Sequence, residues 1–452
     1  MLDAAVRTGC EAVHPGYGFL AEDAAFARAC AAAGVTFIGP PAAAIEAMGS
    51  KISARRLAQA AGVPVVPGDV PEEQTDDAVA AAIDRIGRPA LVKAAAGGGG
   101  IGMRLAGPGE DVRPAIRAAR RDALHAFGDG TLYVERLLDR PRHVEIQIIA
   151  DGSGRVVPLF ERECSLQRRH QKVIEESPSP ILTPALRAQM SAAAVAVAEA
   201  VGYRNAGTVE FLVEEREDGD PRFYFLEMNT RLQVEHPVTE AITGLDLVRA
   251  QLLVAAGEPL PFSADTLALR GHAIELRVYA EDPATGFLPQ AGPLLVYREP
   301  GGPGVRVDSG VAEGDAVSVH YDPLLAKLIV HAESRPAALA RAARALSEFA
   351  ILGIATNLPL LRAMVGHPLV RDGRLDTGFL ERELPALLAA AETPDLDPAV
   401  AAVAVHRLIS GGGAAATGAR TIPDPWTTLS GWRIGGNDRP QSGESAPPGV
   451  QT

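Results

Sequence analysis

Polar side chains recur at every second position within residues 225–237, FLEMNTRLQVEHP. The odd positions of this stretch carry Glu227, Asn229, Arg231, Gln233 and Glu235. Alternate side chains of an extended strand lie on one face of it. The pattern therefore predicts a strand that holds two carboxylates, two amides and an arginine in one row.

Elsewhere the pattern predicts helices and strands in alternation. Amphipathic or apolar helical periodicity predicts helices at residues 51–63, 184–202, 244–257 and 335–352. Runs rich in β-branched and aromatic residues predict strands at 131–138, 143–151, 207–215, 222–229, 271–280 and 324–332. Residues 90–106, ALVKAAAGGGGIGMRLA, are expected to form a strand, a glycine loop and a second strand.

The two ends of the chain differ from this middle region. A short strand at 11–14, a helix to about Ala33 and a strand within 34–40 indicate the second half of a parallel α/β domain. Beyond about Glu392 the sequence is rich in Gly, Pro and Ser, and we expect it to be flexible or partly folded. The fold class predicted overall is α/β (α+β).

Composition and charge limit the kinds of function. With 452 residues the chain has room for about three domains. A net charge of −13 argues against a nucleic-acid surface. The cysteines Cys10, Cys30 and Cys164 have no disulfide or zinc spacing, and no leader or membrane-spanning run is visible. We therefore expect a cytoplasmic protein without nucleic-acid or membrane partners.

Two segments are candidates for binding phosphates. Lys93 precedes the glycine run Gly97–Gly100, where backbone N–H groups could surround a phosphate, although a flexible linker explains the glycines equally well. No Walker A sequence follows. Residues 161–180 hold four basic groups, Arg168, Arg169, His170 and Lys172, among several glutamates. This second segment predicts either a solvated charged face or a pocket for a polyanion.

A third group of residues predicts a metal site. Glu227 and Asn229 share a strand face, and Glu210 lies on the preceding strand of the same hairpin, so the three side chains can converge. Their oxygens suit a hard cation such as Mg²⁺ or Mn²⁺, the alternative being an exposed hairpin face. Farther along the row, Arg231 could bind a planar anion and Glu235 could act as a general base. His236 is taken to be structural.

Seven motifs occur in the order and spacing of a known family. They are HPGYGFLAE, MGSKISARR, VKAAAGGGGIGM, PRHVEIQIIAD, ERECSLQRRHQKVIEESPSP, FLEMNTRLQVEHPVTE and GHAIELRVYAEDP. From about residue 9 to about residue 384 the chain resembles the biotin carboxylase family of the ATP-grasp superfamily. The resemblance implies an ATP-grasp fold with a partial N-terminal parallel α/β domain at 1–49, an ATP-grasp domain at 50–260, a C-terminal biotin carboxylase domain at 261–384, and a linker with the possible start of another domain at 385–452. A mobile lid is expected at about 66–137.

The family's reaction is the ATP- and bicarbonate-dependent carboxylation of biotin through carboxyphosphate. By motif match, the implied nucleotide-binding residues are Lys51, Lys93, Gly99, Gly100, Glu135, Arg136, Leu137, Leu138, His143, Gln167, His170, Glu210 and Glu227. The implied metal ligands are Glu210, Glu227 and Asn229. Bicarbonate is expected at Lys172, Arg231 and the Val234 backbone, with Glu235 as base, and biotin at Arg277 and Tyr17. The implied catalytic residues are Arg231, Glu235, Lys172 and Arg277.

The resemblance also sets expectations about partners. The implied cofactors are ATP, Mg²⁺ or Mn²⁺, and biotin carried by another chain, because no MKM-type biotinylation motif occurs. The implied partners are a biotin carboxyl carrier protein or domain and a carboxyltransferase subunit. The family's first strands, on the order of 70 residues, have no counterpart before Met1, so a homodimer is expected only for a complete N-terminal region. Two alternatives remain: another ATP-grasp ligase of the carbamoyl-phosphate synthetase type, and an inactive truncated assembly subunit.

Overall fold

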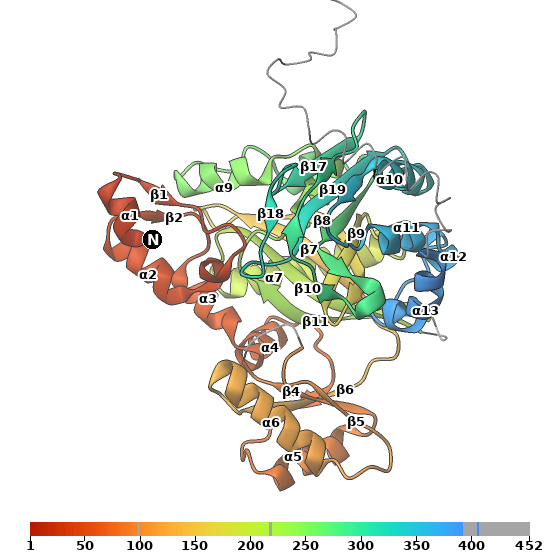
Figure 1. Ribbon diagram of the computed structural model, residues 1–452. Coiled ribbons are helices and arrows are strands. Elements are labelled where there is room, and N and C mark those ends of the chain that lie inside the picture. Colours follow the sequence, from red (N-terminus) through yellow and green to blue (C-terminus); the bar gives the residue numbers. More distant parts are fainter. Residues whose placement is uncertain (97–99, 217–218, 392–404, 406–452) are drawn as a thin grey trace, which may run out of the picture. The chain divides into compact units, whose positions relative to one another are not determined.

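The computed structural model describes residues 1–96, 100–216, 219–391 and 405 (Figure 1). The chain divides into two units, Met1–Glu392 and Thr393–Thr452. Every element below belongs to the first unit. No helix in the described ranges is long and apolar enough to span a membrane.

The N-terminal residues form a small parallel α/β layer, as predicted. Strands β1 (Ala12–Val13) and β2 (Thr36–Phe37) pair in parallel, and α2 (Ala24–Ala32) connects them. The side chain of Asp23 accepts hydrogen bonds from two backbone N–H groups and so caps α2. The remaining elements of this layer are α1 (Leu2–Arg7), the 3₁₀ helix η1 (Phe19–Glu22) and α3 (Ala42–Gly49).

Residues 68–136 build a four-stranded sheet with its own hydrophobic core. Its strand order is β3 (Gly68–Asp69), β6 (Leu132–Arg136), β4 (Ala90–Ala94) and β5 (Arg104–Ala106). Helices α5 (Asp76–Ile86) and α6 (Arg113–Phe127) pack on this sheet through residues such as Ile83 and Ile116. Strands β4 and β5 are antiparallel and flank the glycine loop, which confirms the strand–loop–strand prediction. That this sheet is a mobile lid stays a prediction.

An eight-stranded sheet carries most of the candidate site residues. In spatial order its strands are β11 (Gly219–Asn229), β10 (Asn205–Arg216), β7 (Arg142–Ala150), β8 (Val156–Arg168), β9 (Gln171–Ser177), β12 (His272–Tyr279), β19 (Leu324–Ala332) and β17 (Val305–Ser309). The helices around it are α4 (Lys51–Ala60), α7 (Pro184–Ala200), α8 (His236–Thr243), α9 (Leu247–Ala255) and α10 (Arg335–Glu348).

The two faces of strand β12 differ in what covers them. Ile274 and Leu276 enter a core that includes residues of α10, whereas Ala273 packs with Val238 and Ile242 of α8. Because side chains alternate along a strand, Arg277 lies on the α8 face together with Ala273. Arg277 is therefore on the same side as the start of α8, which follows directly after Glu235.

Two predictions of element boundaries were wrong. The helix expected at 335–352 ends at Glu348, and residues Ala350–Leu352 form strand β20, which pairs with β16 (Val296–Arg298).

The smaller elements that complete the first unit are β13 (Glu281–Asp282), β14 (Leu288–Pro289), β15 (Gly292–Pro293), β18 (Ala316–Val317), η2 (Ala264–Thr266), η3 (Pro283–Thr285), α11 (Leu358–Gly366), α12 (Pro368–Arg371) and α13 (Phe379–Ala391).

The row of polar residues predicted along one strand is also shorter than expected. Strand β11 ends at Asn229, and residues 230–235 form a turn that leads into α8 at His236. Pro237 stands in the first turn of that helix, a position that proline favours because its missing N–H is not needed there. Leu232 enters a core beside α9 while its polar neighbours bind other polar groups. Alternating polarity in a loop, whose polar residues Gln233 and Glu235 are buried as fully as Leu232, thus imitated the period of a strand.

Candidate active site

The three predicted metal ligands meet on the β10–β11 hairpin. Glu210 and Glu227 are direct cross-strand partners, because a bulge at Leu226 shifts the register between this pair and the pair of Phe211 and Phe225. Asn229 Nδ2 donates to Glu210 Oε1 at 3.0 Å. Burial, together with the adjacent Glu210 carboxylate, raises the pKa of Glu227. Two close carboxylates and an amide oxygen fit a hard divalent cation, which would remove this repulsion.

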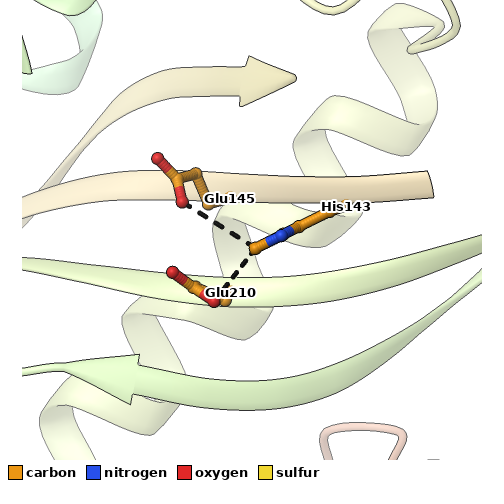
Figure 2. A group of neighbouring side chains, drawn as sticks. All are labelled: His143, Glu145 and Glu210. Atoms are coloured by element: carbon orange, nitrogen blue, oxygen red, sulfur yellow. Dashed lines mark ion pairs between the residues drawn. The ribbon is translucent and has the colours of Figure 1, made fainter. Parts of the chain in front are cut away.

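His143 contributes to the same end of the site (Figure 2). Its Nε2 lies 2.9 Å from Glu210 Oε2 and 4.0 Å from Glu145 Oε2. Gln167 Nε2 lies 3.2 Å from the other ring nitrogen, Nδ1. Burial opposes protonation of His143, but the carboxylate of Glu210 outweighs it and raises the pKa of the imidazole. Gln167, which the family resemblance placed at the nucleotide, therefore orients His143.

Lys172 joins three buried carboxylates. Its Nζ donates to Glu145 Oε2 at 2.5 Å, to Glu235 Oε1 at 2.6 Å and to Glu210 Oε1 at 3.0 Å. Burial disfavours the ammonium, yet these carboxylates together hold the pKa of Lys172 well above its ordinary value. Within the basic segment, Lys172 is thus buried among opposite charges, whereas Arg169 and His170 are exposed.

Glu235 lies between two cations at the start of α8. Its Oε1 accepts from Lys172, and its Oε2 accepts from Arg277 Nη2 at 2.8 Å. Burial opposes ionisation of Glu235, but Lys172, Arg277 and Arg162 outweigh burial and hold its pKa well below the ordinary range. Glu235 is therefore ionised at neutral pH and can accept a proton once these cations bind something else.

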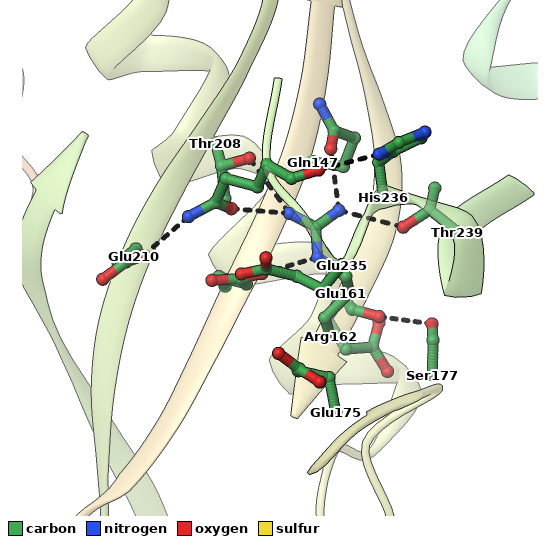
Figure 3. A network of polar contacts seen from close by, with 12 residues as sticks. Gln147, Glu161, Arg162, Glu175, Ser177, Thr208, Glu210, Glu235, His236 and Thr239 are labelled. Carbon is green, nitrogen blue, oxygen red and sulfur yellow. Dashed lines mark hydrogen bonds and ion pairs between the residues drawn. The ribbon is translucent and has the colours of Figure 1, made fainter. Parts of the chain in front are cut away.

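Arg162 is a residue that sequence reasoning did not find (Figure 3). The side chain is fully buried on β8, and its three nitrogens donate five hydrogen bonds. The acceptors are Glu145, Gln147, Thr239, Thr208 and Gln233, at 2.5 to 3.0 Å. Gln233 Nε2 in turn donates to Glu210 Oε1 at 3.0 Å. Arg162 therefore ties α8 and the turn at 230–235 to the sheet.

The turn at 230–235 has two further supports. Arg231 Nε donates to Glu22 Oε2 at 2.9 Å, and Arg231 Nη2 donates to Asn229 Oδ1 at 2.9 Å. Lys327 Nζ donates to the backbone carbonyl of Val234 at 2.7 Å. Sequence reasoning found Arg231 and Val234 but missed Glu22 and Lys327. Glu22 stands inside the motif HPGYGFLAE, and an acidic residue there was the available signal.

Predicted phosphate-binding residues lie at the junction of α4 and the four-stranded sheet. Lys93 Nζ is 2.5 Å from Glu135 Oε2, and Arg55 Nη1 is 2.7 Å from Glu135 Oε1. The backbone N–H of Lys51 donates to the Ala95 carbonyl, just before the glycine loop, at 3.1 Å. Burial lowers the pKa of the Lys51 ammonium. Arg55, which sequence reasoning missed, shares the Glu135 carboxylate with Lys93.

The glycine loop contacts the hairpin turn of β8 and β9. Gly100 has a left-handed backbone, with φ of +76°, and a Cβ placed there would lie 2.2 Å from the His170 ring. Only glycine permits both this backbone and this approach. Burial, followed by the charge of Lys93, lowers the pKa of His170. Gly99 lies outside the described residues.

The remaining predicted positions are less closely joined. At the expected adenine hinge, the backbone N–H of Arg136 donates to Pro67 and that of Leu137 donates to Pro89, while Leu138 is buried. Tyr17 is 46% exposed, and within the described ranges no hydrogen bond links it to Arg277.

Comparison with known proteins identifies the family. Three protein-family models match consecutive parts of the chain: Biotin carboxylase, N-terminal domain, at residues 1–45; Carbamoyl-phosphate synthase L chain, ATP binding domain, at 50–263; and Biotin carboxylase C-terminal domain at 275–382. A biotin carboxylase of Halalkalibacterium halodurans is 51% identical over 385 residues, which are 85% of this chain and 84% of that protein. This chain belongs to the biotin carboxylase family.

Solved biotin carboxylases share its structure. The biotin carboxylase domain dimer of 2-oxoglutarate carboxylase from Hydrogenobacter thermophilus, in complex with MgADP, ADP and bicarbonate, is 42% identical with a TM-score of 0.82, covering 87% of this chain and 85% of that one. A biotin carboxylase complex from Campylobacter jejuni is 42% identical with a TM-score of 0.81, covering 84% of each chain. The predicted fold class and family are therefore confirmed.

Some relatives are longer than this chain and match it over part of their length. The methylcrotonoyl-CoA carboxylase subunit alpha of Oryza sativa is 50% identical over 392 residues, which are 86% of this chain and 53% of that protein. This chain therefore spans about half the length of that relative. The biotin carboxylase models at 1–45 and 275–382 flank the ATP-binding model, which argues against the carbamoyl-phosphate synthetase alternative.

Proposed function

We propose that this chain catalyses the ATP- and bicarbonate-dependent carboxylation of biotin. The observation that carries the proposal is the placement of Glu235 between Lys172 and Arg277, beside the carboxylates Glu210 and Glu227. A base, two cations and a candidate metal site within one hydrogen-bonded group suit phosphoryl transfer to a small anion.

The nucleotide would bind between the glycine loop and the β10–β11 hairpin. Mg²⁺ or Mn²⁺ held by Glu210, Glu227 and Asn229 would neutralise charge on the phosphates. Lys51, Lys93, Gly99 and Gly100 would bind phosphate oxygens. The adenine and ribose positions are assigned to Glu135, Arg136, Leu137, Leu138, His143, Gln167 and His170. Because Glu135 neutralises Lys93 in this structure, the nucleotide would have to draw Lys93 away from it.

Bicarbonate would bind where Lys172, Arg231 and the Val234 backbone meet. An anion at this place competes with Glu235 for Lys172, so the pKa of Glu235 rises toward that of a useful base. Glu235 then takes the proton of bicarbonate, a bicarbonate oxygen attacks the γ-phosphorus of ATP, and ADP leaves. Carboxyphosphate decomposes to CO₂ and phosphate, this phosphate accepts the proton of biotin N1′, and the N1′ nitrogen then bonds to the CO₂.

Biotin would enter beside Arg277 and Tyr17. The Arg277 guanidinium can stabilise negative charge on the ureido oxygen as N1′ loses its proton, and that charge exists only along the reaction. A carrier protein or domain would deliver biotin, and a carboxyltransferase would consume the product. Association into a homodimer, for a chain with a complete N-terminal region, is proposed from the dimer named for the Hydrogenobacter thermophilus relative.

The test is ADP release from this chain with ATP, Mg²⁺ and bicarbonate, in the presence and absence of free biotin. We expect a rate that rises with biotin and requires bicarbonate. ADP release that needs an amine in place of biotin would favour a carbamoyl-phosphate synthetase-like ligase. Absence of any biotin-dependent release would overturn the proposal.

A further inference from the structure

A buried carboxylate beside Arg277, that of Glu175, has no role in the proposed reaction. Glu175 on β9 is the direct cross-strand partner of Glu275 on β12, and Arg277 follows two residues after Glu275. Directly opposed residues of an antiparallel pair point to the same side of the sheet, as do residues two apart in a strand. Glu175, Glu275 and Arg277 therefore share the face that α8 covers.

Arg277 is held at two of its nitrogens by two different carboxylates. Its Nε donates to Glu175 Oε1 at 2.6 Å, and its Nη2 donates to Glu235 Oε2 at 2.8 Å. The side chains of Glu175 and Glu235 are 0% and 2% exposed, so neither contact is screened by solvent. A guanidinium is planar, so fixing Nε and one terminal nitrogen fixes the direction of the whole group.

The neighbouring residue provides a contrast on the other face of β9. Glu176 receives both Nε and Nη2 of Arg335, at 2.7 and 2.9 Å, and also lies 2.6 Å from His272 Nε2. The pair of Glu176 and Arg335 is a closed, two-bond ion pair. Arg277 instead divides the same two nitrogens between Glu175 and Glu235. This division keeps Glu235 from forming a two-bond pair with Arg277, which would withdraw both groups from substrate.

We propose that Glu175 is a positioning residue for biotin carboxylation, which holds Arg277 by Nε so that its terminal nitrogens face Glu235 and the biotin ureido oxygen. The inference rests on the proposed function and extends it to a residue that does not touch substrate. If Glu175 is lost, Arg277 turns toward Glu235, the carboxylate that it still contacts. The base and the cation then neutralise each other.

Charges around Glu175 make this support depend on pH. The groups that face it are Arg277, Glu275 and Tyr279 from β12, Glu235 from the start of α8, Lys172 from β9 and Cys164 from β8. Burial raises the pKa of Glu175 to about 7, although Arg277 acts in the opposite direction. The carboxylate is thus largely ionised at pH 8 and largely protonated at pH 6, where its bond to Nε loses the added strength of charge.

Four variants test the proposal: Glu175→Gln, Glu176→Gln, Arg277→Ala and the double variant of Glu175 and Arg277. Glutamine keeps the volume and an acceptor oxygen but cannot ionise. At pH 8 we expect Glu175→Gln to lower kcat/KM for biotin about ten-fold or more, with ATP binding unchanged. At pH 6 the deficit should shrink, because wild-type Glu175 is then itself mostly neutral. Glu176→Gln should leave kcat/KM for biotin unchanged, whatever its effect on thermal stability.

The double variant separates positioning from general destabilisation. If Glu175 acts through Arg277, its substitution should have no further effect on biotin kinetics in the Arg277→Ala background. Additive losses, a deficit equal at pH 6 and pH 8, or an equal deficit in Glu176→Gln would each overturn the proposal. If Glu175→Gln does not fold, Glu175→Asp serves instead; it keeps the charge but cannot reach Nε, and we expect a loss of similar size. A normal biotin rate in Arg277→Ala would refute the role proposed for Arg277 itself, and this inference with it.

Discussion

The two ends of the site differ in how their charges are balanced. At the anion end, which consists of Lys172, Glu235 and Arg277, both cations donate hydrogen bonds to Glu235, and the pKa shifts favour the charged form of each residue. At the metal end, Glu227 faces Glu210, and its pKa is raised by burial and by that neighbour. The protein alone satisfies the first group, whereas the second would gain from an added cation.

This difference indicates how the site is prepared for its ligands. The anion end is assembled in the folded chain, so its ligand has to compete with existing ion pairs. The metal end holds carboxylates whose repulsion a divalent cation would relieve. Glu210 belongs to both ends, because it binds Lys172 and Asn229. We therefore expect metal binding to be felt by Lys172 through this shared carboxylate.

The largest effect should come from the anion end. Arg277→Ala is expected to lower biotin carboxylation by about 10²–10³-fold, as loss of a preorganised donor does, with little change in ATP binding. Steady-state rates with biotin and calorimetric titration with ADP measure the two quantities. Arg344→Ala, which removes a largely exposed arginine of α10, is the control. Equal losses of biotin carboxylation and ATP binding would show that the two ends are not separable.

Acid should lower the stability of the fold through His236, the residue after Glu235. Burial, reinforced by the charge of Lys327, lowers the pKa of His236 to about 4, and its Nδ1 lies 2.7 Å from the Gln233 carbonyl. In the unfolded chain His236 takes up a proton below pH 6.5, whereas in the folded chain it does so only near pH 4. The free energy of unfolding therefore falls as the pH drops through this window. The loss amounts to at most about 3 kcal/mol.

Thermal unfolding between pH 7 and pH 4 measures this contribution. His236→Asn should flatten the decline relative to wild type, because asparagine cannot take up the proton. His320→Asn, at an exposed histidine, should follow wild type. Parallel curves for all three proteins would remove His236 from the acid response.

The metal end should respond to its own substitutions. Glu227→Gln is expected to raise the Mg²⁺ concentration for half-maximal rate at least about ten-fold, because a ligand charge is lost. The KM for bicarbonate at saturating Mg²⁺ should stay near that of wild type. Glu215→Gln, at an exposed residue of the same hairpin, is the control. A large change in bicarbonate KM in Glu227→Gln would mean that the two ends act as one.

The smallest effect is expected at the glycine loop. Gly100 and Gly109 both have left-handed backbones, but a Cβ at Gly109 would meet nothing within 4 Å. Alanine at either position should cost about 1 kcal/mol of backbone strain. Only Gly100→Ala should also displace His170 and weaken ATP binding by a few-fold, as measured by calorimetry. Equal ATP affinities in the two variants would argue against a nucleotide role for this contact.

Local patterns predicted the elements better than their spatial order. The β10–β11 hairpin, the proximity of Glu210, Glu227 and Asn229 on it, and the strands beside the glycine loop followed from period and turn residues. The alternation of polar and apolar residues beyond Asn229 led to a wrong strand prediction, because a loop can also carry polar and apolar side chains alternately without being extended. Boundaries such as the end of α10 depend on strand pairing with β16, which a local pattern does not contain.

Contacts between residues far apart in the sequence were not predicted. The hydrogen-bond acceptors of Arg162 lie on β7, β10, α8 and the turn before α8, up to 77 positions away in the sequence. Glu22 meets Arg231 across 209 positions, and Glu175 meets Arg277 across 102. Charge within a short window does not reveal such partners. The motifs quoted for the family contain these residues without assigning them a contact.

The bulge at Leu226 divides the β10–β11 hairpin into two segments with separate phases. On the site side, Glu227 pairs with Glu210 and Asn229 with Thr208; on the other side, Phe225 pairs with Phe211. In an unbulged ladder Leu226 would stand opposite Glu210, and a methyl-bearing side chain would replace one ligand. A single extra residue thus sets which chemistry the strand offers. We therefore expect that changes of length and pairing on the Phe225 side of the bulge would leave the pairing of Glu227 with Glu210 unchanged.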